Sequence, residues 1–119
     1  MRRDWNVIRR ILLSIDSYQY AYPAACETDH WTLERHLELM RQGGLVETND
    51  EERRRQYGFI QPCQLTWLGQ EFLSECSNTL AWATVTEMLR KKGITPPFCM
   101  LRELLQKQIL EQCEGRERG

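Results

Sequence analysis

The chain has 119 residues, 41% of them hydrophobic and 28% charged, with a formal net charge of −1. These values predict one globular domain and exclude a strongly basic, DNA-coating protein. No apolar run approaches the roughly 20 residues of a membrane span, and the first turn lacks the apolar core of a signal peptide. Five irregularly spaced cysteines favour a reducing compartment over a disulfide framework, so we expect a cytoplasmic protein.

The N-terminal segment predicts a helix that begins after Asp4, a good N-cap residue. Its apolar residues recur at intervals of three and four, which places them on one buried face. They are Trp5, Ile8, Leu12 and Ile15. Residues 17–23 alternate tyrosines with smaller residues before Pro23, which predicts a short strand or extended loop.

A second helix and a hairpin are predicted next. Thr28 or Asp29 can cap a helix that runs to about Gln42, and the following Gly43-Gly44 pair is expected to end it with one glycine in the left-handed conformation. Its apolar stripe is Leu33, Leu37 and Met40. Strands are expected over residues 45–48 and 57–61, joined by the charged loop 49–56.

Three further helices are predicted in the second half of the chain. Thr66 can cap a helix over residues 65–73, in which Gly69 indicates a close packing contact. A helix that starts at Ser77 or Asn78 is expected to end at Gly93, and a last helix to run from Pro97 to Cys113. The expected organisation is a first part over residues 1–76, a helical extension over 77–113 packed on it within one structural domain, and a frayed tail over 114–119.

Several segments of the sequence resemble a family of phage- and prophage-encoded winged-helix proteins of unknown function. They are Arg2 to Leu12, His36 to Val46, Leu65-Thr66-x-x-Gly69-x-Glu71-Phe72-Leu73, and Trp82. Gly43 and Met40 depart from the family pattern, which favours alanine and leucine there. The resemblance covers most of residues 2–90 and implies a winged helix-turn-helix-like domain, mainly helical with a small antiparallel β-hairpin. The last predicted helix adds a C-terminal helical extension to it. The resemblance also implies a phage context, and it carries no activity.

Double-stranded DNA is the first candidate partner, because a winged helix reads base edges with its second helix and touches phosphates or a minor groove with its wing. We expect the contacts to be made by Thr32, Arg35, Glu38, Arg41, Arg53, Arg54 and Arg55. Residues 29–56 carry seven acidic and five basic side chains, so binding should be weak and strongly dependent on salt. The expected function is a DNA-binding transcriptional regulator.

A host protein complex is the alternative partner. Acidic side chains can mimic phosphates toward a basic pocket, and tyrosines are enriched in interfaces. The candidate contacts are Tyr18, Tyr20, Tyr22 and Glu34. The chain would then inhibit a host defence complex, as an anti-CRISPR or other anti-defence protein does.

No catalytic or cofactor motif is found in the sequence. Cys26, His30 and His36 have no second pair at ligand spacing, so a metal site is not expected. Nucleophile elbows, phosphate-binding glycine loops and metalloprotease motifs are absent, which indicates a protein that is not an enzyme.

The last predicted helix carries a wide apolar stripe. Leaving that stripe in water would expose an apolar patch, so we expect a homodimer through the C-terminal helices. The expected interface residues are Phe98, Leu101, Leu105 and Ile109.

Overall fold

The computed structural model describes residues 3–18, 26–48, 52, 55–56 and 62–118. The chain divides into two compact units, residues 1–73 and 74–119. The described part is mainly helical with a two-stranded antiparallel sheet, as the sequence predicts. The observed division after residue 73 falls inside the helix Trp67–Cys76, whereas the sequence predicted a division after residue 76. The predicted packing of the extension on the first part stays a prediction.

Helix α1 spans Trp5–Tyr18 and begins as predicted. The Asp4 carboxylate accepts hydrogen bonds from the backbone N–H groups of Asn6 and Val7, so Asp4 is the N-cap. The prediction of a short strand or extended loop over 17–23 is wrong at its start, because Ser17 and Tyr18 continue the helix; no helix breaker occurs before Pro23. Residues 19–25 lie outside the described residues. The buried face of α1 comprises Trp5, Val7, Ile8, Ile11, Leu12, Ser14 and Ile15.

Helix α2 spans His30–Gln42, and local sequence fixes both of its ends. Asp29 is the N-cap and accepts a hydrogen bond from the Thr32 N–H at 2.8 Å. At the other end Gly44 has a φ of +76°, which confirms the predicted left-handed glycine. The N–H groups of Gly44 and Leu45 bond back to the carbonyl groups of the last turn, at 3.1 and 2.9 Å, and turn the chain into the sheet.

The sheet consists of β1, Val46–Thr48, and β2, Pro62–Leu65, paired antiparallel. The second strand was predicted over 57–61; those residues lie outside the described ones, and the observed strand comes later. Leu65, predicted to open a helix, instead pairs with Val46. The ladder continues to a hydrogen bond from the Thr66 N–H to the Leu45 carbonyl, so the helix can begin only after Thr66.

Helix α4 spans Trp67–Cys76, and its first turn packs against the start of the sheet. Thr66 caps it by accepting a hydrogen bond from the Gly69 N–H at 3.0 Å. A Cβ atom on Gly69 would lie 2.0 Å from the Leu45 carbonyl oxygen, which confirms the predicted close contact. One turn later Phe72 is fully buried and meets the Trp5 ring edge to face, with 5.9 Å between ring centroids.

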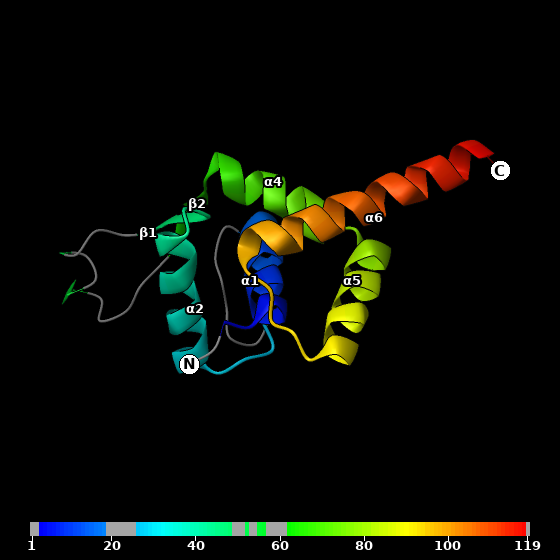
Figure 1. Cartoon of the computed structure of the whole chain (residues 1–119). Helices are drawn as coiled ribbons and strands as arrows, with labels where there is room; N and C mark the ends of the chain where they lie inside the picture. The colour runs from blue at the N-terminus through cyan, green and yellow to red at the C-terminus, as the bar shows by residue number, and fades with distance from the viewer. Residues whose placement is uncertain (1–2, 19–25, 49–51, 53–54, 57–61, 119) are drawn as a thin grey trace. The chain divides into compact units, whose positions relative to one another are not determined.

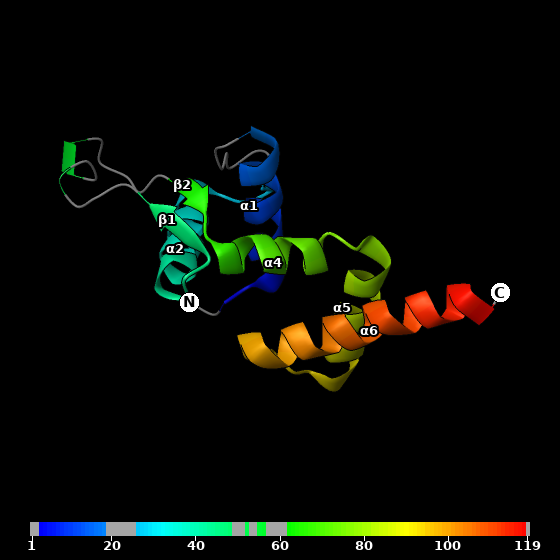
Figure 2. The same cartoon turned by 90° about the horizontal axis from the view of Figure 1, so that it is seen from above.

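The first unit is organised around α1, which contacts both α2 and β2, while α2 contacts β1 (Figures 1 and 2). The apolar stripe predicted for α2 is buried in this core, since Leu33, Leu37 and Met40 are each at most 3% exposed. Packing on the inner side leaves the opposite side of α2 in water.

The second unit contains the pair α5, Thr79–Lys92, and α6, Phe98–Arg118, which contact each other. Asn78 caps α5 by accepting a hydrogen bond from the Ala81 N–H, and Gly93, with a φ of +67°, ends it as predicted. The last helix was predicted to end at Cys113 before a frayed tail. It continues to Arg118, because Gly115 disfavours helix by only about 1 kcal/mol and no proline follows.

We expect the Asp29 cap to contribute stability at neutral pH that is lost at acid pH. Hydrogen bonds from the backbone N–H and the hydroxyl of Thr32 hold the pKa of the Asp29 carboxyl below its ordinary value. A carboxyl whose pKa is lower in the folded state stabilises the fold above its unfolded pKa, and this stabilisation is lost as the pH falls through the folded pKa.

Asp29→Asn is the matched variant, because asparagine caps a helix equally well but does not titrate. The midpoint of urea unfolding should fall more steeply with acid pH in the natural protein than in Asp29→Asn. Parallel pH profiles of the two proteins would contradict this assignment.

Candidate functional site

The outer side of α2 forms the exposed surface on which the predicted DNA contacts lie. Arg35 and Arg41 are exposed and Thr32, Glu34 and Glu38 are partly exposed, whereas the intervening His36 and Leu37 are buried. A helix with one buried side and one open side of polar residues can present side chains to a partner. The structure therefore brings the predicted residues of α2 onto one accessible face.

Most of the charge on this face is neutralised within the helix. The Arg41 Nε donates to the Glu38 carboxylate at 2.9 Å, and its Nη2 makes a second bond to the same group. His30 lies 3.6 Å from the Glu34 carboxylate. Arg35 has no hydrogen bond or ion pair with any other residue of the described ranges. Its guanidinium is therefore the cation on α2 that is available to a phosphate or a base.

Thr32 already has a structural partner, because its hydroxyl donates to the second carboxylate oxygen of Asp29 at 2.9 Å. In this conformation the hydroxyl can only accept a further hydrogen bond. A hydrogen bond donated by this hydroxyl to DNA would require its bond to Asp29 to break.

The wing and the tyrosine segment are described only in part. Arg55 is exposed. Arg53 and Arg54 lie outside the described residues, as do Tyr20, Tyr22 and the side chain of Tyr18. The predicted roles of these residues stay predictions.

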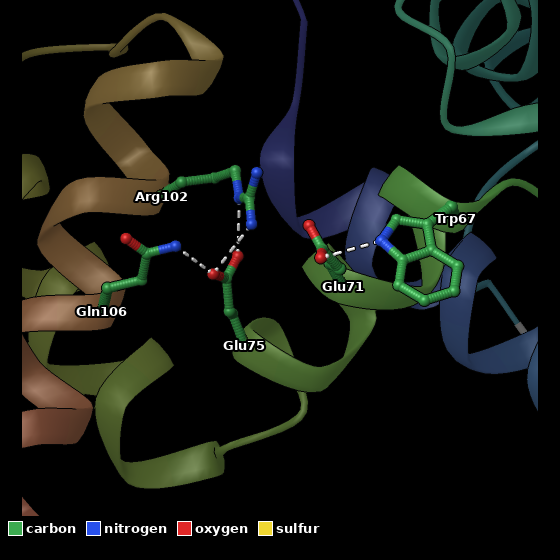
Figure 3. Close-up of polar contacts among 5 residues, drawn as sticks. All are labelled: Trp67, Glu71, Glu75, Arg102 and Gln106. Atoms are coloured by element: carbon green, nitrogen blue, oxygen red, sulfur yellow. Dashed lines mark hydrogen bonds and ion pairs between the residues drawn. The ribbon is translucent and has the colours of Figure 1, made fainter.

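Two exposed tryptophans in the first unit were missed by the sequence analysis. Trp31 is 61% exposed in the first turn of α2, and Trp67 is 80% exposed in the first turn of α4. Figure 3 shows the Trp67 indole N–H donating to Glu71, at 2.9 Å. Helical periodicity could have predicted the exposure of Trp31, since a buried stripe of residues 33, 37 and 40 places position 31 on the opposite side of α2.

His36 is a buried structural residue and is not free to bind a ligand. Its Nδ1 lies 2.8 Å from the Thr32 carbonyl oxygen, and its Nε2 accepts a hydrogen bond from the Asp4 N–H at 2.9 Å. Since a carbonyl can only accept, Nδ1 carries the proton and the ring is neutral. The side chain thus joins α2 to the start of α1, a contact across 32 positions that no local pattern shows.

The cysteines and histidines of the described ranges do not gather into a metal site. No group of three or more His, Cys, Asp or Glu placed to hold a metal occurs there. Burial raises the pKa of the Cys26 thiol, against the smaller opposing effects of Ser14 and Arg10, so this thiol stays protonated. Cys76, Cys99 and Cys113 are free thiols as well.

In the second unit, the residues predicted to form a dimer interface do not share an exposed face. Leu101 and Leu105 are fully buried within a single chain, and Phe98 lies under the Arg102 guanidinium, 5.7 Å from its ring centroid. Ile109 is half-buried. The prediction that these leucines meet a second copy is wrong, because their own chain already covers them.

The Glu75 carboxylate holds the second unit together from the end of α4. It accepts two hydrogen bonds from the Arg102 guanidinium, at 2.8 and 3.1 Å, and a third from the Gln106 amide (Figure 3). The pair is well shielded, since the side chains of Glu75 and Arg102 are 12% and 21% exposed. A satisfied pair of this kind fixes the position of α6 in its unit and leaves neither group free for chemistry.

The described residues define a small, mainly helical protein in which one side of α2 is exposed. The chain belongs to the family described as hypothetical protein DUF2513, whose model matches residues 2–95. It is similar to an uncharacterized protein of Haemophilus influenzae, with 26% identity over 114 residues that cover 92% of this chain and 96% of that protein. No solved structure matches the chain.

These findings confirm the part of the resemblance that concerns a family without an assigned function. Among the described helices, none is long and apolar enough to cross a membrane. The expected cytoplasmic location stays a prediction.

Proposed function

We propose that residues 1–73 form a winged-helix-type unit that binds double-stranded DNA, as a transcriptional regulator of phage type does. The order of its elements supports the proposal: α1, then α2, then the two-stranded sheet that leads into α4. In this proposal α2 is the reading helix, and the connection between β1 and β2 is the wing. The role is binding rather than catalysis.

The observation that carries the proposal is the open outer face of α2 with Arg35 on it. The core packs against the inner stripe of α2, so this face is left accessible for its whole length. Because Arg35 has no partner among the described residues, it can contact guanine or phosphate without first breaking an ion pair there.

The charge balance sets the strength of binding that we expect. The Glu38 carboxylate holds Arg41, and Glu47 lies exposed on β1 near the wing. Because acidic groups oppose the phosphates, we expect the binding to be weak and to be lost as salt screens its few phosphate contacts.

A duplex titration at low and at physiological salt tests the proposal. Low-salt binding is expected, and it should weaken in Arg35→Ala and in the triple variant Arg53→Ala/Arg54→Ala/Arg55→Ala. Arg90→Ala is the matched control for Arg35→Ala: it also removes one positive charge, but from a residue of α5 that is paired with Glu87. Absence of binding at low salt, or equal losses in Arg35→Ala and Arg90→Ala, would contradict the proposal.

A protein partner is the second candidate function, and Trp31 is the observation that favours it. Exposed tryptophans are enriched at the centres of protein interfaces, and Trp31 lies on the same helix as Arg35. The partner would be a host defence complex that the protein inhibits. Trp31→Ala should then abolish capture of the complex and leave the fold intact, and a protein that binds DNA but no host complex would exclude this candidate.

A further inference from the structure

The outer face of α6 includes, between positions 100 and 110, four exposed residues in a symmetric order. They are Met100, Glu103, Lys107 and Leu110. Their spacings of three, four and three are those of a coiled-coil seam and place all four along one side of the helix. Met100 is 36% exposed and Leu110 is 59% exposed.

This face is separate from the side of α6 that packs inside the chain. Leu101 and Leu105 cover the inner side and are fully buried, and Arg102 and Gln106 bond to Glu75. Within the described residues, Glu103 and Lys107 make neither an ion pair nor a hydrogen bond. Between residues 100 and 110 the helix thus presents two apolar side chains with a charge of each sign between them, neither of which has a partner among the described residues.

The order of these four side chains is self-complementary when a second copy of the helix runs in the opposite direction. In an antiparallel pair of helices related by a twofold axis at position 105, position 100 meets position 110 and position 103 meets position 107. We propose that a second copy of this chain docks on the outer face of α6 in this antiparallel register. Met100 then packs against Leu110 of the second copy, and Glu103 pairs with Lys107 of the second copy, each contact occurring twice.

Charge selects the antiparallel orientation. A parallel pair in register would place Glu103 against Glu103 and Lys107 against Lys107, and like charges in contact oppose association. The antiparallel pair converts the same four charged groups into two ion pairs. Polar residues at seam positions commonly fix the register of a coiled coil in this way, at a cost in stability.

The dimer that follows is reversible. The seam from residue 100 to residue 110 is about 15 Å long at the rise of an α-helix, which is short for a permanent interface. Monomer and dimer should therefore exchange as the protein concentration changes. The inference does not depend on whether the first unit binds DNA or protein.

Sedimentation equilibrium of the full chain over a range of concentrations tests the inference. The apparent mass should rise from the 14.2 kDa of one chain toward twice that value. Leu110→Glu should hold the chain at the monomer mass. Leu80→Glu, which changes an exposed leucine of α5, is the matched control and should dimerise like the natural protein.

Charge reversal tests the register. Glu103→Lys or Lys107→Glu alone places like charges together in both central contacts, so each should weaken the dimer by about tenfold or more. The double variant Glu103→Lys/Lys107→Glu restores both ion pairs with their signs exchanged and should recover most of the affinity. Circular dichroism should show unchanged helix content in every variant.

Three outcomes would overturn the inference. The natural protein could stay at the monomer mass at the highest soluble concentration. Leu80→Glu could dissociate the dimer as strongly as Leu110→Glu does. Lastly, the double charge reversal could bind no better than the single ones, which would exclude the antiparallel register.

Discussion

Gly69→Ala is expected to lower the free energy of unfolding by about 3 kcal/mol, the upper range for overpacking a tight site. The added Cβ would lie 2.0 Å from the Leu45 carbonyl oxygen, and a backbone atom cannot turn aside as a side-chain end can. That carbonyl also accepts the hydrogen bond from the Thr66 N–H that closes the sheet. Relief of the clash would therefore move either the start of α4 or the end of the ladder.

Gly43→Ala is the matched control for this prediction. Gly43 has a φ of −80°, and its added Cβ would find its closest neighbour, the Leu39 carbonyl oxygen, at 3.4 Å. Alanine there should change the stability by less than about 1 kcal/mol. Urea unfolding followed by circular dichroism measures both variants, and equal unfolding midpoints for Gly69→Ala and Gly43→Ala would show that the close contact is not essential.

His36→Leu is expected to cost about 2 kcal/mol of stability, although the site is buried and leucine is apolar. The loss comes from the Asp4 N–H, which donates to the His36 Nε2 and would be left without this partner at the start of α1. The Nδ1 contact with the Thr32 carbonyl is lost as well. The helical content of α2 should persist, since leucine is a good helix former.

Two further variants identify the cause of this loss. His36→Gln can place an amide oxygen near the Nε2 position and should recover part of the stability. His30→Leu, in the same helix, changes an exposed residue whose ion pair with Glu34 contributes little, so its effect should be under about 1 kcal/mol. If His36→Leu is as stable as the natural protein, the bridge to Asp4 contributes nothing to the fold.

The helix ends show how much of the fold local sequence can predict. Asp4 and Thr66 cap helices as predicted, and Asp29 and Asn78 are each one of the two caps predicted for their helix. The reason is that a cap depends on groups within three residues of the capping side chain. The left-handed glycine after α2 follows from the same local chemistry. The misassignment of Leu65 to a helix has a different origin, since its structure depends on a distant partner. Leu65 becomes a strand residue because Val46 pairs with it.

In the candidate site, too, some features follow from local sequence and others depend on contacts that the sequence pattern does not show. The sequence by itself placed Arg35, Glu38 and Arg41 away from the apolar stripe of α2, since helical periodicity is a local property. Only the tertiary structure decided that Glu38 neutralises Arg41 and that His36 is committed to α1.

For α6, the sequence alone showed a wide apolar stripe and could not divide it between two faces. The tertiary structure assigned Leu101 and Leu105 to the core and left Met100 and Leu110 in water. The physical reason is that periodicity fixes the angle of each side chain around its own helix axis. Burial depends on which neighbour lies at that angle, and that neighbour can come from anywhere in the chain.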